Sequence, residues 1–327
     1  MSESLRRVVV TAPGKLVIAG EYVVLDGAEA LVAAVDRRLR VVGSARAGDG
    51  SAGPRGGSPD AGGLPPEALL ARRHAESALG EVAMDLSVDA HALAQDGKKL
   101  GLGSSSAASA AAAGAVVAWR GGDPAAERRR ILGWALAGHR AIAPEGSGVD
   151  VAAATLGGFV RLCRDRVEEA APLAWPRGVE VEVVWTGTPA RTSELVRRVK
   201  ALETEAPARY RARMDALREA AADLIDALSR GDAPAVAASA DAHGRAMGAL
   251  GEAAGAPIVT DALAGLAALA RACGGGAKPS GAGGGDVALA FFTRPEDAAR
   301  FRARCTEAGL TLLSLTLGAE GVRAEER

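Results

Sequence analysis

Residues 99–119 read KLGLGSSSAASAAAAGAVVAW, a glycine-rich turn that leads into a run of small residues. The run predicts a helix over Ser105–Trp119, and Gly101 and Gly103 stand just before its start. Glycine lets a backbone approach an anion closely, and the free N–H groups at a helix start point toward that anion. The stretch therefore predicts a phosphate-binding loop, with a serine N-cap after a tight turn as the structural alternative.

Two other interpretations of this stretch are disfavoured. A dinucleotide-binding GxGxxG loop needs a third glycine where Ser106 stands, and it needs a strand that ends at the first glycine. Residues 100–119 carry no charge and have the length of a membrane span, but alanine, serine and glycine drive insertion weakly. We therefore expect a small-residue helix that packs closely against a sheet.

The composition limits the class of protein. The chain has 327 residues, with 39 basic and 40 acidic side chains, and domains of about 100–200 residues make two domains or one large one the expectation. The net charge of −1 and an aromatic content of 3% argue against a nucleic-acid or anionic-membrane partner. Three scattered cysteines and four histidines without metal-ligand spacing argue against a disulfide framework or a zinc site. With an N-terminal apolar run too short for a signal peptide, these features predict a cytoplasmic protein.

Short β-branched segments separated by Pro-Gly and Asp-Gly turns predict strands near the start of the chain, at Arg7–Thr11, Leu16–Val24, Ala30–Val35 and Leu39–Val42. Residues 43–63 are almost all small or turn-forming and predict a loop. Helical periodicity predicts helices at Pro65–Gly80, Ser105–Trp119, Pro124–His139, Arg211–Arg230, Pro234–Leu250, Ile258–Cys273 and Pro295–Ala308. Further strands are expected at Asp85–Leu93, Val179–Thr186, Val287–Phe292 and Thr311–Leu317. The pattern resets near Pro176–Gly178, so we place a domain boundary near residue 178.

Three further segments combine glycine with a charged residue. Residues 12–15 read APGK, residues 145–150 read EGSGVD, and residues 278–286 read KPSGAGGGD before an apolar strand. Each alone has a structural explanation, as a turn, an acid at a helix start or a flexible hairpin. The chain has only five lysines, however, and four of them lie in or beside the glycine-rich segments: Lys15, Lys98, Lys99 and Lys278. Compact ammonium groups in such places favour phosphate chemistry.

Taken together, the segments resemble the GHMP kinase family of small-molecule kinases. The matching pieces occur in family order and with family spacing: APGKLVIAGEYVVLDG at 12–27, KLGLGSSSAA at 99–108, GSGVDVAAATLGG at 146–158 and KPSGAGGGDVALAF at 278–291. The resemblance implies an α+β fold in two domains. Residues 1–178 would form a half like ribosomal protein S5 domain 2, residues 179–327 would form a ferredoxin-like half, and a nucleotide would bind between them.

Within the family, the segments are most similar to the subfamily of phosphomevalonate kinases. The opening GEYVVLDG contains Tyr22 and Asp26, the closing KPSGAGGGD ends at Asp286, and residues 185–192 read WTGTPART. The sequence departs from the subfamily at Arg191, where serine is usual, and in its long glycine-rich insert. The subfamily resemblance implies transfer of the γ-phosphoryl of ATP to phosphomevalonate, with diphosphomevalonate as the product of a step in isoprenoid synthesis.

The resemblance also implies a set of site residues. Lys15 and Asp150 would be catalytic. ATP would bind at Lys99, Gly101, Leu102, Gly103, Ser104, Ser105, Ser106 and Ala107. The acceptor would bind at Lys15, Tyr22, Ser147, Gly148, Asp150, Arg191, Ser280, Gly281, Ala282 and Gly283, with Lys98 and Lys99 as further cationic candidates.

Magnesium is the implied metal ion, and its ligands are expected at Ser105 and Glu145, with Ser104 and Asp150 as alternatives. Counting back from Asp150, the place where mevalonate kinases have a glutamate holds His139, a poor Mg²⁺ ligand. The expected partners are ATP and phosphomevalonate, with no nucleic acid and no membrane, and the protein would be a monomer or a homodimer.

Both substrates of such a transfer are anions, and two like charges about 4 Å apart repel by about 4 kcal/mol at an effective dielectric near 20. The site must therefore supply cations, with Lys15, Mg²⁺ and the helix start at Ser105 as the leading candidates. A phosphate acceptor with a second pKa of about 6 needs no general base at pH 7, so we expect Asp150 to orient Lys15 or the acceptor, or to help hold Mg²⁺. The alternatives are mevalonate kinase or another GHMP kinase, a catalytically idle nucleotide-binding relative and an NAD enzyme.

Overall fold

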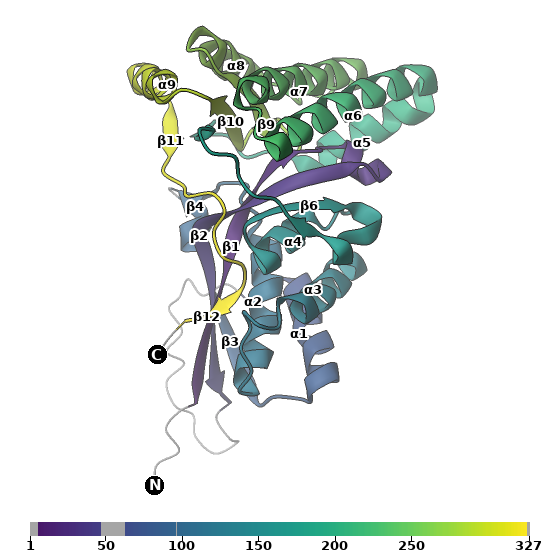
Figure 1. Ribbon diagram of the computed structural model, residues 1–327. Coiled ribbons are helices and arrows are strands. Elements are labelled where there is room, and N and C mark those ends of the chain that lie inside the picture. Colours follow the sequence, from purple (N-terminus) through teal and green to yellow (C-terminus); the bar gives the residue numbers. More distant parts are fainter. Residues whose placement is uncertain (1–5, 47–62, 96, 326–327) are drawn as a thin grey trace.

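The computed structural model describes residues 6–46, 63–95 and 97–325, and its chain forms two layered halves, one above the other (Figure 1). The lower half is built on a sheet with the strand order β12-β1-β2-β6-β7, and β3 pairs with β2 beside this path. The strands of this sheet are β1 (Arg7–Ala19), β2 (Glu29–Ala45), β3 (Met84–Asp89), β6 (Phe159–Cys163), β7 (Ala171–Pro172) and β12 (Arg323–Ala324). β1 and β2 are long enough to extend up to the second half (Figure 1).

Four helices cover this sheet in two layers: α1 (Pro66–Leu79), α2 (Ser104–Trp119), α3 (Arg128–Ile142) and α4 (Val149–Leu156). α2 and α4 pack on the strands, and α1 and α3 pack against α2. α2 is buried over almost its whole length, which its small side chains permit. A Cβ at Gly114 would lie 3.1 Å from Val10 Cγ1 and from Val322 Cγ2, so the helix touches the sheet closely. This contact confirms the predicted small-residue helix.

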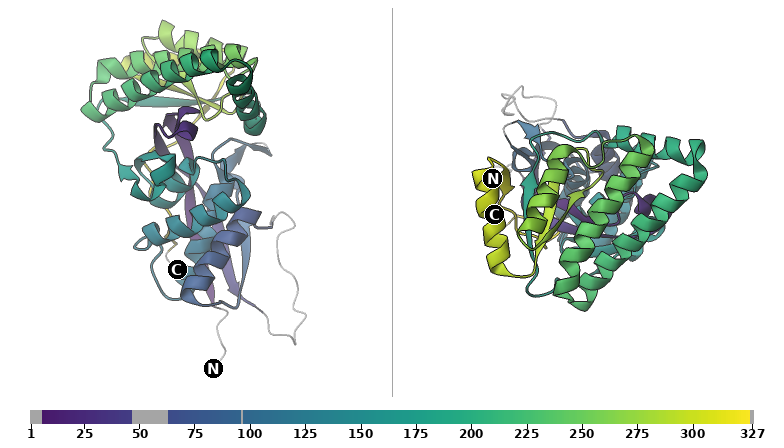
Figure 2. Two further views of the ribbon diagram at one scale, coloured as in Figure 1. Left: turned by 90° about the vertical axis from the view of Figure 1, so that its right-hand side faces the viewer. Right: turned by 90° about the horizontal axis from the view of Figure 1, so that it is seen from above.

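The upper half contains a sheet with the order β11-β8-β10-β9, in which all pairs are antiparallel. Its strands are β8 (Glu180–Trp185), β9 (Gly276–Ser280), β10 (Val287–Phe292) and β11 (Thr311–Leu313). Its helices are α5 (Thr192–Glu205), α6 (Pro207–Arg230), α7 (Ala233–Ala254), α8 (Asp261–Ala272) and α9 (Pro295–Glu307). α7, α8 and α9 pack on this sheet, and α5 and α6 pack against α7 (Figure 2). The predicted α+β class is thereby confirmed, while the boundary near residue 178 stays a prediction.

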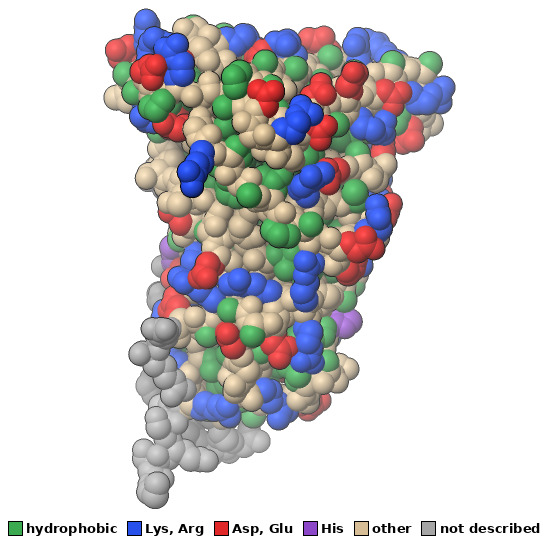
Figure 3. Space-filling view, in the orientation of Figure 1, with side chains coloured by type: hydrophobic (Ala, Val, Ile, Leu, Met, Phe, Trp, Pro, Cys, Tyr) green, Lys and Arg blue, Asp and Glu red, His purple; other side chains and the backbone are tan. Residues whose placement is uncertain are grey.

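Short elements complete the chain. They are the two-residue strands β4 (Ala94–Gln95) and β5 (Lys98–Lys99) and the 3₁₀ turns η1 (Val23–Asp26), η2 (His91–Leu93) and η3 (Arg164–Glu169). Basic and acidic side chains are interspersed over the face in Figure 3, in keeping with the near-zero net charge. Among the described residues, no helix combines the length and the apolar character that crossing a membrane requires.

The first strands differ from the prediction. Arg7–Thr11 and Leu16–Val24 were expected as separate strands, but β1 runs through Pro13-Gly14, where the pairing with β2 shifts register as a bulge rather than turning. Pro13 has no backbone N–H to donate to the neighbouring strand, and a bulge accommodates such a residue. One strand therefore continues where a turn was predicted. The strand also stops at Ala19, since Gly20 and Tyr22 have φ values of 97° and 63° that no strand accommodates.

Other boundaries are also corrected. Ala30–Val35 and Leu39–Val42 merge into β2, which includes residues 43–45 of the predicted loop, and residues 47–62 of that loop lie outside the described residues. The strand predicted over Asp85–Leu93 ends at Asp89, the helix predicted from Pro124 begins at Arg128, and the last predicted strand ends at Leu313. β6, β9 and β12 were not predicted as strands. The remaining predicted helices occur within a few residues of their expected bounds.

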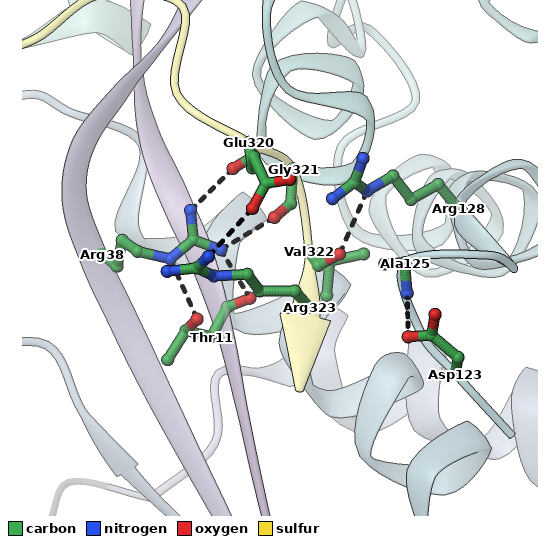
Figure 4. Close-up of polar contacts among 9 residues, drawn as sticks. All are labelled: Thr11, Arg38, Asp123, Ala125, Arg128, Glu320, Gly321, Val322 and Arg323. Carbon is green, nitrogen blue, oxygen red and sulfur yellow. Dashed lines mark hydrogen bonds and ion pairs between the residues drawn. The ribbon is translucent and has the colours of Figure 1, made fainter. Parts of the chain in front are cut away.

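The C-terminal segment returns to the first sheet, where β12 pairs with β1 (Figure 1). The Arg38 guanidinium holds this segment, since it donates to the Glu320 carbonyl at 2.6 Å, to the Gly321 carbonyl at 2.7 Å and to Thr11 Oγ1 at 2.9 Å (Figure 4). Burial lowers the pKa of Arg38 to about 10. Arg128 adds a bond of 3.1 Å from Nε to the Val322 carbonyl. The upper half is therefore connected to the lower half at both of its ends.

Candidate active site

A cleft of about 1080 Å³ lies between the two halves and is lined by segments from all four glycine-containing motifs. The predicted site residues that line it are Lys15, Tyr22, Lys99, Gly101, Leu102, Gly103, Ser104, Ser105, Ser106, Glu145, Ser147, Gly148, Asp150, Arg191, Ser280, Gly281 and Ala282. Ala107 is buried within α2, and Gly283 packs against the Ile258 carbonyl, so neither lines the cleft. Segments that are far apart in the sequence therefore share one cavity.

Lys15 projects from β1 at the centre of the cleft. Its backbone N–H donates to the Leu102 carbonyl at 2.9 Å, which joins the strand to the 99–106 loop. Glycine at the preceding position favours this approach, because a Cβ at Gly14 would lie 3.1 Å from the Leu102 carbonyl oxygen. The Lys15 Nζ lies 3.4 Å from Asp150 Oδ1, so the two predicted catalytic residues form an ion pair.

The start of α2 has the form of an anion-binding site. Gly101 and Gly103 have φ values of 73° and 78°, left-handed conformations that favour glycine. They turn the chain so that residues 104–106 form the first helical turn, with N–H groups that have no partner inside the helix. A Cβ at Gly103 would lie 3.0 Å from Lys15 Cγ. This open backbone beside an ammonium group suits the phosphates of a nucleotide.

α4 presents its start to the same place. Gly148 has a φ of 74° and forms its N-cap, and Asp150 stands in its first turn, where a carboxylate is favourable with the helix dipole. The Ser147 Oγ accepts the Val149 N–H at 3.5 Å. Two helix starts thus face Lys15 from different sides.

The loop after β9 is tied to the end of β1. The Ser280 Oγ accepts the Val17 N–H at 2.9 Å and donates to the Val17 carbonyl at 3.1 Å. The Tyr22 hydroxyl donates to the Ala282 carbonyl at 2.5 Å. Lys278 to Ser280, predicted as loop, are a buried part of β9 that pairs with β10. Residues 280–282 are therefore held at the cleft by the first half of the molecule.

A buried cluster of three titratable side chains lies behind this loop. The Lys278 Nζ is 2.5 Å from Glu21 Oε1, which also accepts the Gly281 N–H at 3.2 Å, and both side chains are excluded from solvent. His243 Nε2 lies 3.6 Å from Glu21 Oε2. Burial, opposed by the partner's charge, raises the pKa of Glu21 and lowers that of Lys278. Burial also holds the pKa of His243 well below its usual value, so the ring is neutral and its contact with Glu21 is not an ion pair.

Asp286 lies where the upper half meets the glycine-rich loop of residues 99–106. A Cβ at Gly101 would lie 2.3 Å from Asp286 Oδ2, so the two segments touch only because position 101 is glycine. The Asp286 Oδ1 accepts the Ala190 N–H at 3.0 Å, and the residue has a φ of 51°, which is unusual for a side-chain-bearing residue. The two halves therefore lie in close contact at this edge of the cleft.

Cations from α5 and the turn before it line the upper wall. They are Arg191, Arg197 and Lys200. Lys200 is paired with Glu145 across the cleft, so the carboxylate predicted as a metal ligand is engaged with an ammonium group. In the described parts of the chain, Arg197 makes no hydrogen bond or ion pair.

Oxygen donors suited to a magnesium ion lie at the starts of α2 and α4. Serine hydroxyls and the Asp150 carboxylate are hard ligands of the kind that Mg²⁺ prefers, and they face the proposed phosphate site. The Ser105 Oγ donates to the carboxylate of Glu67. Within the described ranges, no group of three or more His, Cys, Asp and Glu side chains is arranged to hold a metal ion. The donor set thus fits an ion that nucleotide phosphates and water also coordinate.

Sequence reasoning missed Glu21, His243 and the structural part played by Lys278. Glu21 stands inside the quoted GEYVVLDG segment, and Lys278 is one of only five lysines, so both had a signal. His243 had none, because a single histidine on a helix carries no pattern. Arg197 and Lys200 also had no signal, because basic residues on a helix usually face solvent.

Comparison with known proteins places these observations in one family. The model described as "GHMP kinases N terminal domain" matches residues 70–158, and that described as "GHMP kinases C terminal" matches residues 224–310. A phosphomevalonate kinase from Streptomyces sp. (strain CL190) is 32% identical, with 98% of this chain and all of the relative covered. A mevalonate kinase from Aeropyrum pernix is 31% identical, with 97% of this chain and 98% of the relative covered.

A solved structure has the same fold. The phosphomevalonate kinase of Streptococcus pneumoniae in complex with phosphomevalonate and AMPPNP superposes with a TM-score of 0.78. The match covers 95% of this chain and 99% of that one at 21% identity. The fold implied by the motifs is confirmed, including its division into two layered halves.

Proposed function

This chain belongs to the GHMP kinase family, and on that premise we propose that it transfers the γ-phosphoryl of ATP to the phosphate of phosphomevalonate. The observation that supports this most is the Lys15–Asp150 pair, 3.4 Å apart, which faces the glycine-rich start of α2 in the interdomain cleft. The full-length similarity to a phosphomevalonate kinase favours this acceptor. As further parts of the proposal, the enzyme works in the cytoplasm as a monomer or a homodimer.

In the proposed reaction, the N–H groups of residues 104–106 bind the ATP phosphates, and the left-handed Gly101 and Gly103 keep the backbone open for them. Lys99 lines the same side of the cleft and adds positive charge. Mg²⁺, bound with the nucleotide, would neutralise phosphate charge, and Ser105 and Asp150 would hold it.

The acceptor would enter from the side of the 145–150 and 280–282 segments. Its phosphate would lie beside Lys15, whose ammonium group offsets the repulsion between two anions as they approach. Arg191 and Arg197, which line the upper wall, would attract the anionic acceptor into the cleft. Tyr22 supports the 280–282 loop through its bond to Ala282.

Asp150 has an orienting role in this proposal. A phosphate acceptor is already ionised near pH 7, so no proton need be removed from it. The carboxylate fixes the position of the Lys15 ammonium group instead. The pH dependence of kcat in Asp150→Asn tests this. We expect a lower kcat with an unchanged acid limb, whereas disappearance of the acid limb in the variant would show proton abstraction by Asp150.

An acceptor panel tests the substrate. Release of ADP from ATP is measured with phosphomevalonate, mevalonate, homoserine and galactose at matched concentrations, with Lys15→Ala as the inactive control. We expect turnover with phosphomevalonate alone. Turnover only with a non-phosphorylated acceptor would reject the proposed substrate and leave the family assignment in place. Thermal stabilisation by ATP without turnover on any acceptor would identify an idle nucleotide-binding relative.

A further inference from the structure

Ser105 and Glu67 meet where α1 and α2 begin. Ser105 lines the cleft in the first turn of α2, and its Oγ donates a hydrogen bond to a carboxylate oxygen of Glu67. Glu67 stands in the first turn of α1, is half-buried, and does not itself line the cleft. The carboxylate therefore contacts the serine without lining the cavity itself.

The packing of the helices sets this contact. Pro66 is the first residue of α1, so its fixed φ defines where the helix starts. The backbone of Glu67 then lies against α3 at Gly138, where a Cβ would be 2.5 Å from the Glu67 carbonyl oxygen. No side chain larger than that of glycine fits there, so the start of α1 cannot shift without moving α3. Glu67 is thus held in place beside Ser105.

A serine hydroxyl has one proton to donate and two lone pairs that can accept. When the proton is directed to Glu67, both lone pairs of Ser105 Oγ remain for a cation in the cleft. A carboxylate that accepts from a metal ligand fixes the orientation of that ligand and makes it more basic. Magnesium takes few protein ligands and completes its shell with phosphate oxygens and water, so one oriented hydroxyl is enough to matter.

We propose that Glu67 is a positioning residue that orients the Ser105 hydroxyl toward the magnesium ion of the bound nucleotide. This inference rests on the proposed use of ATP, and it assigns to α1 a part in the site that no motif indicated. It also disfavours Glu145 as the metal-associated carboxylate, because that side chain is 72% exposed and paired with Lys200.

Binding of Mn²⁺ in the presence of AMPPNP, followed by electron paramagnetic resonance, tests the proposal without any acceptor or turnover. Glu67→Leu removes the acceptor of the hydroxyl proton and should weaken Mn²⁺ binding about 10- to 100-fold, as loss of an outer partner does at other metal sites. Glu67→Gln keeps an acceptor oxygen and should bind within a few-fold of wild type. Equal losses in the two variants would make Glu67 a direct ligand and would overturn the positioning role.

A double-mutant cycle provides the second arm. In a Ser105→Ala background there is no hydroxyl to orient, so Glu67→Leu should cause no further loss of Mn²⁺ affinity. Additive losses would show that the two residues act independently and would overturn the proposal. Glu76→Gln, on the same helix but paired with Arg72, is the matched control and should bind Mn²⁺ as wild type does.

The outcome separates from that of the proposed function. A wild-type protein that binds Mn²⁺ with AMPPNP but turns over no phosphomevalonate fails the proposed function and leaves this inference testable by the same variants. Unchanged Mn²⁺ binding in Glu67→Leu overturns this inference alone. Binding of AMPPNP in the presence of EDTA should be the same in all variants, and a loss of that binding in both Glu67 variants would show general damage to the loop and overturn the specific role.

Discussion

Two lysine–carboxylate pairs lie near the junction of the halves, and they differ in their access to water. Lys278 and Glu21 are 2.5 Å apart, with side chains that are 0% and 2% exposed. Lys15 and Asp150 are 3.4 Å apart, with side chains that are 10% and 35% exposed, and both line the cleft. The first pair is closed off from water, whereas the second lies in the cleft, where an anionic ligand could reach the Lys15 ammonium group.

The difference shows how one region can be fixed while its neighbour stays reactive. Burial removes water from the Lys278 and Glu21 charges, and for that reason the pKa of Glu21 is raised and the pKa of Lys278 is lowered. Such a pair does little for net stability, but it is costly to break. Through Gly281, it fixes the loop that forms one wall of the cleft. The Lys15–Asp150 pair can then be held close to its working geometry without being buried itself.

The largest effect is expected when the buried Lys278–Glu21 pair is broken. Lys278→Met leaves the Glu21 carboxylate buried without its cation, and the free energy of unfolding should fall by about 3–5 kcal/mol. Urea unfolding followed by circular dichroism measures this. The same replacement at the exposed Lys200 is the control and should leave the unfolding midpoint unchanged. Equal effects at the two lysines would mean that burial does not distinguish them.

The second effect concerns the solvent-accessible Lys15–Asp150 pair. Lys15→Ala removes a cation from the point where two anions approach, and kcat should fall by about 10²–10³-fold, a magnitude typical for loss of one transition-state donor. Nucleotide affinity should change much less, because in the proposed site residues 101–106 bind the phosphates without help from Lys15. Steady-state kinetics and titration with AMPPNP measure the two quantities. An unchanged kcat would reject the assigned role of Lys15. A loss of stability in Lys15→Ala as large as that in Lys278→Met would show that the two pairs do not differ in their structural contribution.

The third effect is a pH dependence of stability that arises from the buried cluster of Glu21, Lys278 and His243. His243, which faces Glu21 and Lys278, stays neutral in the folded protein because burial depresses its pKa, whereas in the unfolded chain it gains a proton below its ordinary pKa of 6.5. Stability that is present above pH 6.5 should therefore be lost as pH falls, by up to about 1.4 kcal/mol per pH unit. His243→Leu should flatten this slope between pH 7 and 5 in urea unfolding. Parallel slopes in the two proteins would contradict the prediction.

The smallest effect is expected at the rim. Glu145 and Lys200 form an exposed ion pair across the cleft, and such pairs contribute little because water screens them. Glu145→Ala should leave the unfolding midpoint unchanged, and any effect should appear as a faster release of product in single-turnover experiments. A clear loss of stability would show that the rim pair, and not only the buried pair, holds the halves together.

The sequence predicted most helices because they carry local boundary signals. α1 begins at Pro66 after Pro65, and α9 begins at Pro295. The strand errors have a physical cause, since Pro13-Gly14 has the composition of a turn but forms a bulge within a long paired strand. β12 is two residues long and depends on Arg38 from another strand, so no local pattern could indicate it.

The candidate site was predictable to the extent that glycine marks backbone approaches. Gly101, Gly103 and Gly148 all have left-handed conformations at the cleft. The buried cluster of Glu21, Lys278 and His243 was not predictable. Burial of a charge depends on contacts between segments far apart in the chain, and Glu21 and Lys278 are more than 250 positions apart.

The return of the chain to its first sheet limits how the cleft can open. The polypeptide passes from the lower half to the upper half between Pro172 and Glu180, and it passes back between Leu313 and Arg323, where β12 is pinned by Arg38. These two covalent tethers prevent the halves from drifting apart. A single proteolytic nick in either tether would therefore leave the halves joined through the other.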